Sequence, residues 1–128
     1  DSGYGLFTSG EAPMVLSYGT SPAYHLEYEE TRRYQAALFG EGHMTQIEGG
    51  GILRWTDQRE AAETFIDFML GTSFQEVIPL TNWMYPARAD VSLPDSYRIA
   101  LRPEQQLYPP RDVSIDDSID MWLDALGR

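Results

Sequence analysis

The chain has 128 residues, 42% of them hydrophobic, which is sufficient for one ordinary domain with a single core. Its formal charge is −11 and all nine basic residues are arginines, so no basic stripe is present to bind nucleic-acid phosphates, and no nucleic-acid partner is expected. The absence of cysteine excludes a disulfide framework and a thiol nucleophile, and the longest apolar stretches fall far short of the roughly 20 residues that span a bilayer.

Two short strands are predicted in the first half of the chain. Residues 14–18 form an apolar run between Pro13 and Gly19, which is the pattern of a buried strand. Residues 43–48 alternate polar and apolar side chains and predict the second strand. The three glycines at 49–51 lack the spacing of a phosphate loop and have no lysine after them, so we interpret them as a flexible connection.

A helix is predicted between these strands, from Pro22 to about Arg32. Ser21 suits the N-cap, and Pro22 suits the first helical position because its missing N–H needs no partner there. The free N–H groups and the positive dipole end of such a helix form a natural anion site. Capping alone is the simpler role for Ser21, since most capped helices carry the same donors.

The second half of the chain predicts further helices. Asp57 and Glu60 form a capping-box pattern before an amphipathic run that ends at Gly71. A new helix start follows at Ser73 and is stopped by Pro79. Residues 82–110 are rich in proline and tyrosine and predict irregular structure, whereas residues 114–127 have the apolar spacing of a C-terminal amphipathic helix.

Catalytic and metal-binding patterns are weak in this sequence. His25 and His43 lie on different predicted elements, and neither belongs to a ligand pair with metal-site spacing. A nucleophile elbow of the Gly-x-Ser-x-Gly type does not occur. We therefore predict a binding protein with neither a catalytic residue nor a metal site.

Aromatic side chains are the more informative class. Tyr18, Tyr24, Trp83 and Tyr85 fall at element ends or in turns, where packing alone does not require them. A planar cationic ligand stacked on such rings gains about 0.5–2 kcal/mol for each cation–π contact. Taken one at a time, each ring is better explained by burial in the core. Core packing is also the role that we assign to the remaining tryptophans, at positions 55 and 122.

Two sequence strings carry a resemblance to a known family. The string at residues 17–24, Ser-Tyr-Gly-Thr-Ser-Pro-Ala-Tyr, and the string at 82–86, Asn-Trp-Met-Tyr-Pro, resemble those of the thiamine-binding periplasmic proteins of ABC importers. The segments 4–8, 41–48, 65–69 and 74–79 follow in the same order, and the resemblance covers most of the chain up to Pro94. The glycines at 49–51 depart from the family pattern, and residues after Tyr97 match poorly.

The resemblance implies an α/β fold, part of a type II periplasmic-binding-protein fold with two lobes and hinge strands. The expected ligand is thiamine, thiamine monophosphate or thiamine diphosphate, held in the cleft between the lobes, and no cofactor is expected. Tyr18, Tyr24 and Trp83 stand where the family places ligand-contacting aromatic residues. Ser21, with the helix start, is a candidate for the phosphate of a phosphorylated ligand.

The resemblance also implies a division into lobes and a set of partners. Residues 1–43 are assigned to lobe 2, 44–81 to lobe 1, and 82–128 to a hinge crossing and the C-terminal part of lobe 2, with hinge candidates at 43–48 and 82–86. We expect the N-terminal half of the protein to lie upstream of this chain and to cover an apolar face of the helix at 61–70. The other expected partner is an ABC permease, with the protein in the periplasm or lipid-anchored outside the cell membrane.

Two other functions remain alternatives. A ferric-ion-binding protein of the same fold also uses paired tyrosines, although such pairs are adjacent whereas Tyr18 and Tyr24 are six positions apart. Another small-solute binding protein of this fold belongs to the same alternative. From a different class, an aromatic-lined carbohydrate-binding or hydrolytic module is the second, and hydrolysis would require a pair of carboxylates at the cleft.

Overall fold

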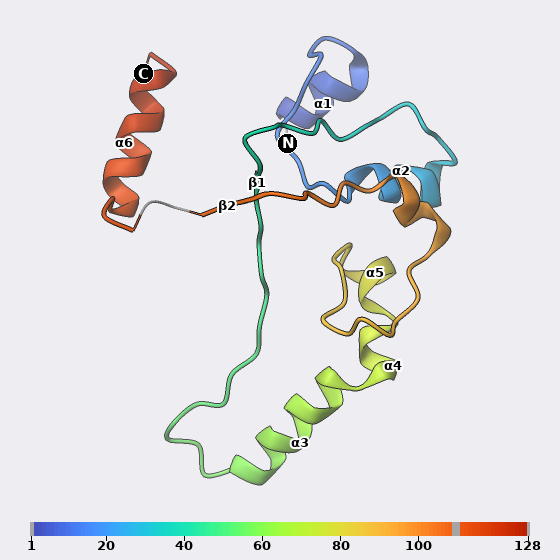
Figure 1. Ribbon diagram of the computed structural model, residues 1–128, viewed down its shortest axis with the longest axis vertical. Coiled ribbons are helices and arrows are strands. Elements are labelled where there is room, and N and C mark those ends of the chain that lie inside the picture. The colour runs from blue at the N-terminus through green and yellow to red at the C-terminus, as the bar shows by residue number, and fades with distance from the viewer. Residues whose placement is uncertain (1, 109–110, 128) are drawn as a thin grey trace. The chain divides into compact units, whose positions relative to one another are not determined.

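The computed structural model of the chain describes residues 2–108 and 111–127 (Figure 1). Its contacts form two units. The first holds the residues up to Ala37 together with Glu48–Arg102, and the second holds Leu38–Ile47 together with the residues from Pro103 onward. The predicted lobe boundaries, after residues 43 and 81, stay a prediction.

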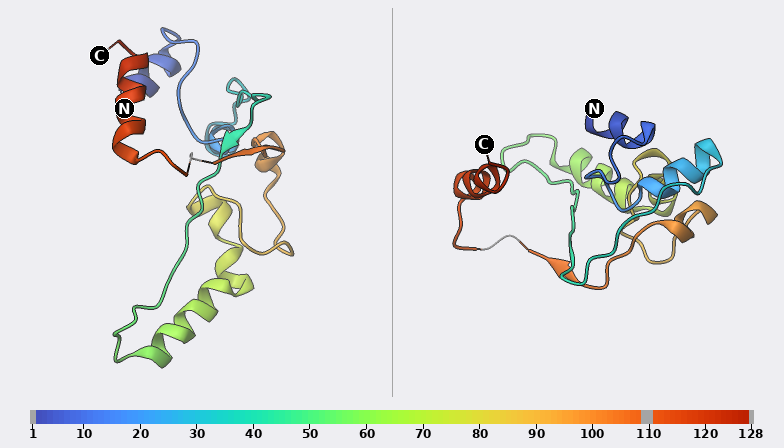
Figure 2. Two further views of the ribbon diagram at one scale, coloured as in Figure 1. Left: turned by 60° about the vertical axis from the view of Figure 1, so that its left-hand side comes forward. Right: turned by 90° about the horizontal axis from the view of Figure 1, so that it is seen from above.

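The first unit is built from helices. In chain order they are α1 (Ser2–Ser9), α2 (Ser21–Glu29), α3 (Arg59–Leu70), α4 (Thr72–Gln75), α5 (Ile78–Thr81) and the 3-10 helix η1 (Asp95–Ile99). Helix α2 packs beside η1, although about 70 residues separate them in the sequence (Figures 1 and 2). The core is small: Ala23 and Pro79 are fully buried and Tyr97 is 5% exposed.

The second unit contains a short parallel pair of strands and one helix. Strand β1 (His43–Met44) pairs with β2 (Gln106–Leu107), with His43 opposite Gln106. Gly42, just before β1, has a φ of +106°, and a Cβ there would lie 2.8 Å from the carbonyl oxygen of Gln105. Only glycine therefore fits this approach of the two segments. Helix α6 spans Ile115–Ala125.

The strand predictions are corrected by the structure. Residues 14–18 have no strand conformation, and Leu16 in their middle is 98% exposed. The predicted strand at 43–48 is reduced to the two residues of β1. The physical reason is that a strand exists only where a neighbouring strand pairs with its backbone, and among the described residues none pairs with 14–18.

The predicted helices are present with shifted boundaries, except that the helix expected from Ser73 to Pro79 is two short helices, α4 and α5, and that α1 was not predicted. Helix α2 begins one residue early, at Ser21 after the N-cap Thr20, and it ends at Glu29 because Glu30 has a left-handed backbone, with φ of 52°. Helix α3 begins after Gln58, without the side-chain bond of the predicted capping box. Pro79 lies in the first turn of α5 rather than stopping a helix, since the first turn needs no N–H from it.

The C-terminal helix is predicted correctly. Helix α6 spans residues 115–125 of the predicted 114–127, and the Ser114 side chain caps it by accepting a hydrogen bond of 3.0 Å from the Asp117 N–H.

Large apolar side chains remain on the surface of both units. Trp55 and Trp122, assigned to the core from the sequence, are 87% and 61% exposed, so that assignment is wrong. Phe65 and Phe68 of α3 are 58% and 56% exposed, as expected for a helix face that the described residues do not cover. Amphipathic spacing identifies which residues need a cover but not whether the same chain supplies it.

Candidate aromatic binding site

The central feature of the first unit is a cluster of three aromatic rings. Tyr24 and Tyr28 lie one turn apart on α2, and Trp83 follows α5. The Trp83 ring meets Tyr24 edge-on at a centroid distance of 5.1 Å and Tyr28 at 5.5 Å, and the two tyrosines are 5.2 Å apart. Tyr24 and Tyr28 are 41% and 61% exposed. The structure thus brings together Tyr24 and Trp83, which the sequence strings had singled out separately.

The backbone of Trp83 is in an unusual conformation. Its φ is +54°, in the left-handed region that large side chains rarely adopt. Such a conformation costs on the order of 1–3 kcal/mol and persists only where the surroundings hold it in place. Residues of this kind concentrate at functional sites, which is a second reason to regard Trp83 as part of a binding site.

Tyr97 of η1 holds the Trp83 backbone in this left-handed conformation. Its ring lies parallel to Trp83, with an interplanar angle of 6° and a centroid distance of 6.3 Å. The Tyr97 hydroxyl donates to the carbonyl oxygen of Pro79 at 2.7 Å and lies 3.3 Å from that of Met84, so it connects both ends of the turn that carries Trp83. Burial, with a smaller contribution from Tyr85, raises the pKa of Tyr97 to about 12.

A hydrogen-bonded network lies next to the cluster on α2. His25 is 4% exposed, and its Nδ1 lies 2.7 Å from the carboxylate of Glu29. Its Nε2 is bonded to the hydroxyl of Tyr4 on α1. Because an ionised carboxylate only accepts, Nδ1 carries a proton, and the Tyr4 hydroxyl donates to Nε2 when the ring is neutral. Burial first, then the charge of Glu29, raises the pKa of Tyr4. The network fixes α1 against α2.

Tyr18 is not brought into the cluster. It lies before α2 and is 69% exposed, and in the described part of the chain no ring contact joins it to Tyr24 or Trp83. Its carbonyl oxygen accepts a bond of 3.0 Å from the N–H of Ser21. The ring of Tyr18 is therefore available on the surface beside the start of α2.

Ser21 does not act as the predicted N-cap. It is inside the first turn of α2, and its hydroxyl is hydrogen-bonded to that of Ser17 at 2.7 Å. The backbone donors at this helix start are already used, since the N–H groups of Ser21 and Ala23 donate to Tyr18 and Thr20. The argument for an anion site from free N–H groups is thereby weakened, and the paired hydroxyls are the polar groups that remain.

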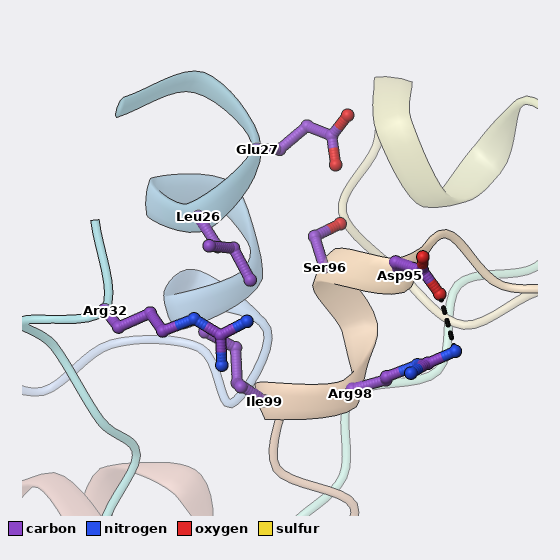
Figure 3. A pocket seen from close by; sticks show the side chains of 7 residues that line it. All are labelled: Leu26, Glu27, Arg32, Asp95, Ser96, Arg98 and Ile99. Atoms are coloured by element: carbon purple, nitrogen blue, oxygen red, sulfur yellow. Dashed lines mark ion pairs between the residues drawn. The ribbon is translucent and has the colours of Figure 1, made fainter. Parts of the chain in front are cut away.

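A separate pocket of about 470 Å³ lies between α2 and η1 (Figure 3). Leu26 and Glu27 of α2 and Arg32 after it line the pocket together with Asp95, Ser96, Arg98 and Ile99 of η1, and Figure 3 shows the Ile99 side chain next to that of Arg32. Arg98 is engaged with Asp95 at 2.8 Å, and both are largely exposed. Its charges of both signs and the absence of aromatic lining distinguish this pocket from the aromatic cluster.

Residues 2–108 and 111–127 contain neither a metal-ligand cluster nor a membrane-spanning helix. No group of three or more His, Asp or Glu side chains in this part of the chain is arranged to hold a metal ion. None of its helices has the length and apolar character needed to cross a membrane.

Several residues of the site were missed by the sequence reasoning. Tyr28 has the i+4 spacing from Tyr24 that places two side chains on one helix face, and this signal was available. Tyr97 had no comparable signal, because its ring partner Trp83 lies 14 positions away in the chain. His25 has the i+4 spacing to Glu29, but its bond to Tyr4 spans 21 positions. Tyr85, singled out with the other aromatics, contacts Tyr97 edge-on at 5.4 Å and has a structural role.

The arrangement suits the binding of a planar, positively charged group. The three rings offer π-faces and edges at the surface, and α2 carries Glu27 and Glu29 but no Arg or Lys. Aromatic rings attract a cation through their quadrupole, and nearby carboxylates add a negative potential.

Comparisons with known proteins agree with this chemistry. No family model matches the sequence. The chain is 45% identical to the thiamine-binding periplasmic protein of Brucella melitensis, 43% to that of Salmonella typhimurium and 41% to that of Escherichia coli. Each match covers 98% of this chain, which spans 39% of the length of each relative.

A solved structure gives the same result for the fold. It is described as a periplasmic thiamin binding protein and matches with a TM-score of 0.80 and 41% identity, covering 99% of this chain and 41% of that one. The match confirms the predicted fold, part of a two-lobed α/β binding protein. Over nearly all of its residues, the chain is therefore homologous to part of the thiamine-binding periplasmic proteins.

Proposed function

We propose that the protein to which this chain belongs captures thiamine or a thiamine phosphate outside the cytoplasm. It acts as a carrier without catalysis. The names of its relatives support the ligand and the periplasmic location. The observation that carries the proposal is the contact between Tyr24 and Trp83. These two residues come from separate parts of the sequence, and their ring centroids lie 5.1 Å apart on the surface of α2.

The ligand chemistry fits this cluster. The thiazolium ring of thiamine is planar and carries a fixed positive charge, so it gains from Tyr24 and Trp83 both stacking and cation–π attraction. The net charge of −11 adds a long-range attraction for a cation. Tyr18, exposed beside the start of α2, is proposed as the third aromatic contact.

The test of this function is a titration followed by the fluorescence of Trp83 alone. The chain has three tryptophans, and replacing Trp55, Trp122 and any tryptophan encoded outside this chain by phenylalanine leaves Trp83 as the reporter. We expect saturable quenching by thiamine, measured on the gene product at its full encoded length. Absence of quenching at millimolar thiamine contradicts the proposal, and a charge-transfer band on titration with ferric ion favours the iron-binding alternative instead.

Ser21 is proposed to contact the phosphate of a phosphorylated ligand through its hydroxyl. Its hydrogen bond to Ser17 places two hydroxyls together at the start of α2. A hydrogen bond to a charged group contributes about 1.5–3 kcal/mol, so Ser21→Ala is expected to weaken thiamine monophosphate at least tenfold more than thiamine. Calorimetric titration of both ligands measures the difference. An equal loss for the two ligands removes Ser21 from the phosphate site.

The remaining parts of the proposal concern the whole protein. We propose that residues 1–43 and 82–128 contribute to one lobe and 44–81 to the other, with an upstream half completing both. Ligand capture then proceeds by lobe closure, followed by delivery to an ABC permease. The uncovered face of α3, with Phe65 and Phe68 exposed, supports a cover from outside this chain.

A further inference from the structure

The most exposed ring of the aromatic cluster is Tyr28. It is 61% exposed, compared with 41% for Tyr24, while Tyr97 on another side of Trp83 is 5% exposed. The buried Tyr97 marks the side of Trp83 that faces the core, and the two α2 tyrosines mark the side that faces solvent. A ligand that approaches Trp83 from solvent therefore passes alongside Tyr28.

Ring spacing decides where such a ligand rests. Two parallel rings that enclose a planar ligand stand about 7 Å apart, twice the optimal carbon–carbon separation. In the cluster the three centroid distances are 5.1, 5.2 and 5.5 Å, and the interplanar angles are 60–76°. No ligand fits between these rings, so it lies against the outer surface of the cluster, where Tyr28 offers the largest exposed fraction.

The charges around Tyr28 favour a cationic ligand. Its neighbours on α2 are Glu27 and Glu29, and Glu30 follows the helix. Glu29 is engaged with His25, whereas Glu27 lines the pocket beside η1. The carboxylates of α2 and the net charge of −11 add a long-range negative potential that favours a fixed positive charge at the exposed Tyr28 ring.

We propose that Tyr28 is a further ligand-contacting residue, which extends the Tyr24–Trp83 surface by one helical turn and selects for a positively charged planar ring. This inference rests on the proposed function. It adds an aromatic contact that neither of the two sequence strings contains, because Tyr28 follows the first string by four positions.

The experiment compares Tyr28→Ala, Tyr28→Phe and the control Tyr108→Ala in calorimetric titrations on the gene product at its full encoded length. Tyr108 is 75% exposed and its hydroxyl donates to Gln106, so its removal tests the loss of an exposed tyrosine as such. Tyr28→Ala is expected to weaken thiamine about three- to tenfold. Tyr28→Phe, which keeps the ring, and Tyr108→Ala are expected to bind as the unaltered protein does.

Selectivity for charge is measured with the neutral aminopyrimidine portion of thiamine alone. Its affinity is expected to change less than twofold in Tyr28→Ala, because it lacks the cationic ring. Equal affinity of Tyr28→Ala and the unaltered protein for thiamine overturns the inference while leaving the proposed function intact. Failure of the unaltered protein to bind thiamine contradicts the proposed function itself. An unchanged thermal unfolding midpoint of Tyr28→Ala confirms that the loss is local.

Discussion

Replacing Tyr97 by alanine is expected to lower the free energy of unfolding by about 3–5 kcal/mol, the cost of truncating a buried aromatic side chain. The effect is large because Tyr97 is the bulkiest member of a small core and its hydroxyl connects Pro79 to η1. Urea denaturation followed by circular dichroism measures the change. A loss below 1 kcal/mol contradicts the role assigned to this side chain.

The matched control is Tyr97→Phe, which keeps the ring and removes the hydroxyl. It leaves the Pro79 carbonyl without its 2.7 Å donor, at a cost of about 1–3 kcal/mol. The folded state raises the pKa of Tyr97 from 10.0 to about 12. The contribution of the neutral hydroxyl is therefore complete below pH 10 and is lost as the pH rises to about 12. This alkaline loss of stability is expected to be smaller in Tyr97→Phe.

Replacing Trp83 by alanine is expected to weaken thiamine binding by about thirtyfold, the effect of a tryptophan that dominates a binding surface. The proposed ligand loses the largest ring of the cluster, and Tyr24 and Tyr28 lose the partner that holds their rings together. Isothermal titration calorimetry measures the affinity, because the Trp83→Ala variant lacks the tryptophan whose fluorescence reports on binding. Unchanged affinity contradicts the assignment of Trp83 to the site.

Two further variants separate the Trp83 ring from its backbone. Trp83→Gly also lacks the ring but accepts the φ of +54° without a Cβ clash, so it is expected to be more stable than Trp83→Ala by about 1 kcal/mol. Both are expected to bind thiamine equally weakly. Trp83→Phe, which keeps a smaller ring, is expected to bind with an intermediate affinity. A Gly variant that binds better than the Ala variant indicates that backbone strain contributes to ligand binding.

Local signals predicted α2, α3 and α6 because the information lies within one or two turns, whereas α1 and η1 were not predicted. The apolar spacing and the terminal glycine identify α3, and Ser114 identifies the start of α6. Boundaries shifted by a residue or two where neighbouring side chains compete for the same cap, as Thr20 and Ser21 do at α2. Strands were predicted less well, because residues 14–18 have the pattern of a strand without a partner in the described part of the chain.

Composition and local pattern are enough to establish that this chain is acidic, forms amphipathic helices and carries the aromatic residues Tyr24 and Trp83 in two distinctive strings. The contact between these two rings, the addition of Tyr28 and the packing of Tyr97 against the left-handed Trp83 become visible in the folded chain alone. The difference lies in the sequence separation of the interacting residues. A helix or a cap depends on residues three or four positions apart, whereas the cluster depends on α2 meeting a turn that lies more than 50 positions further along the chain.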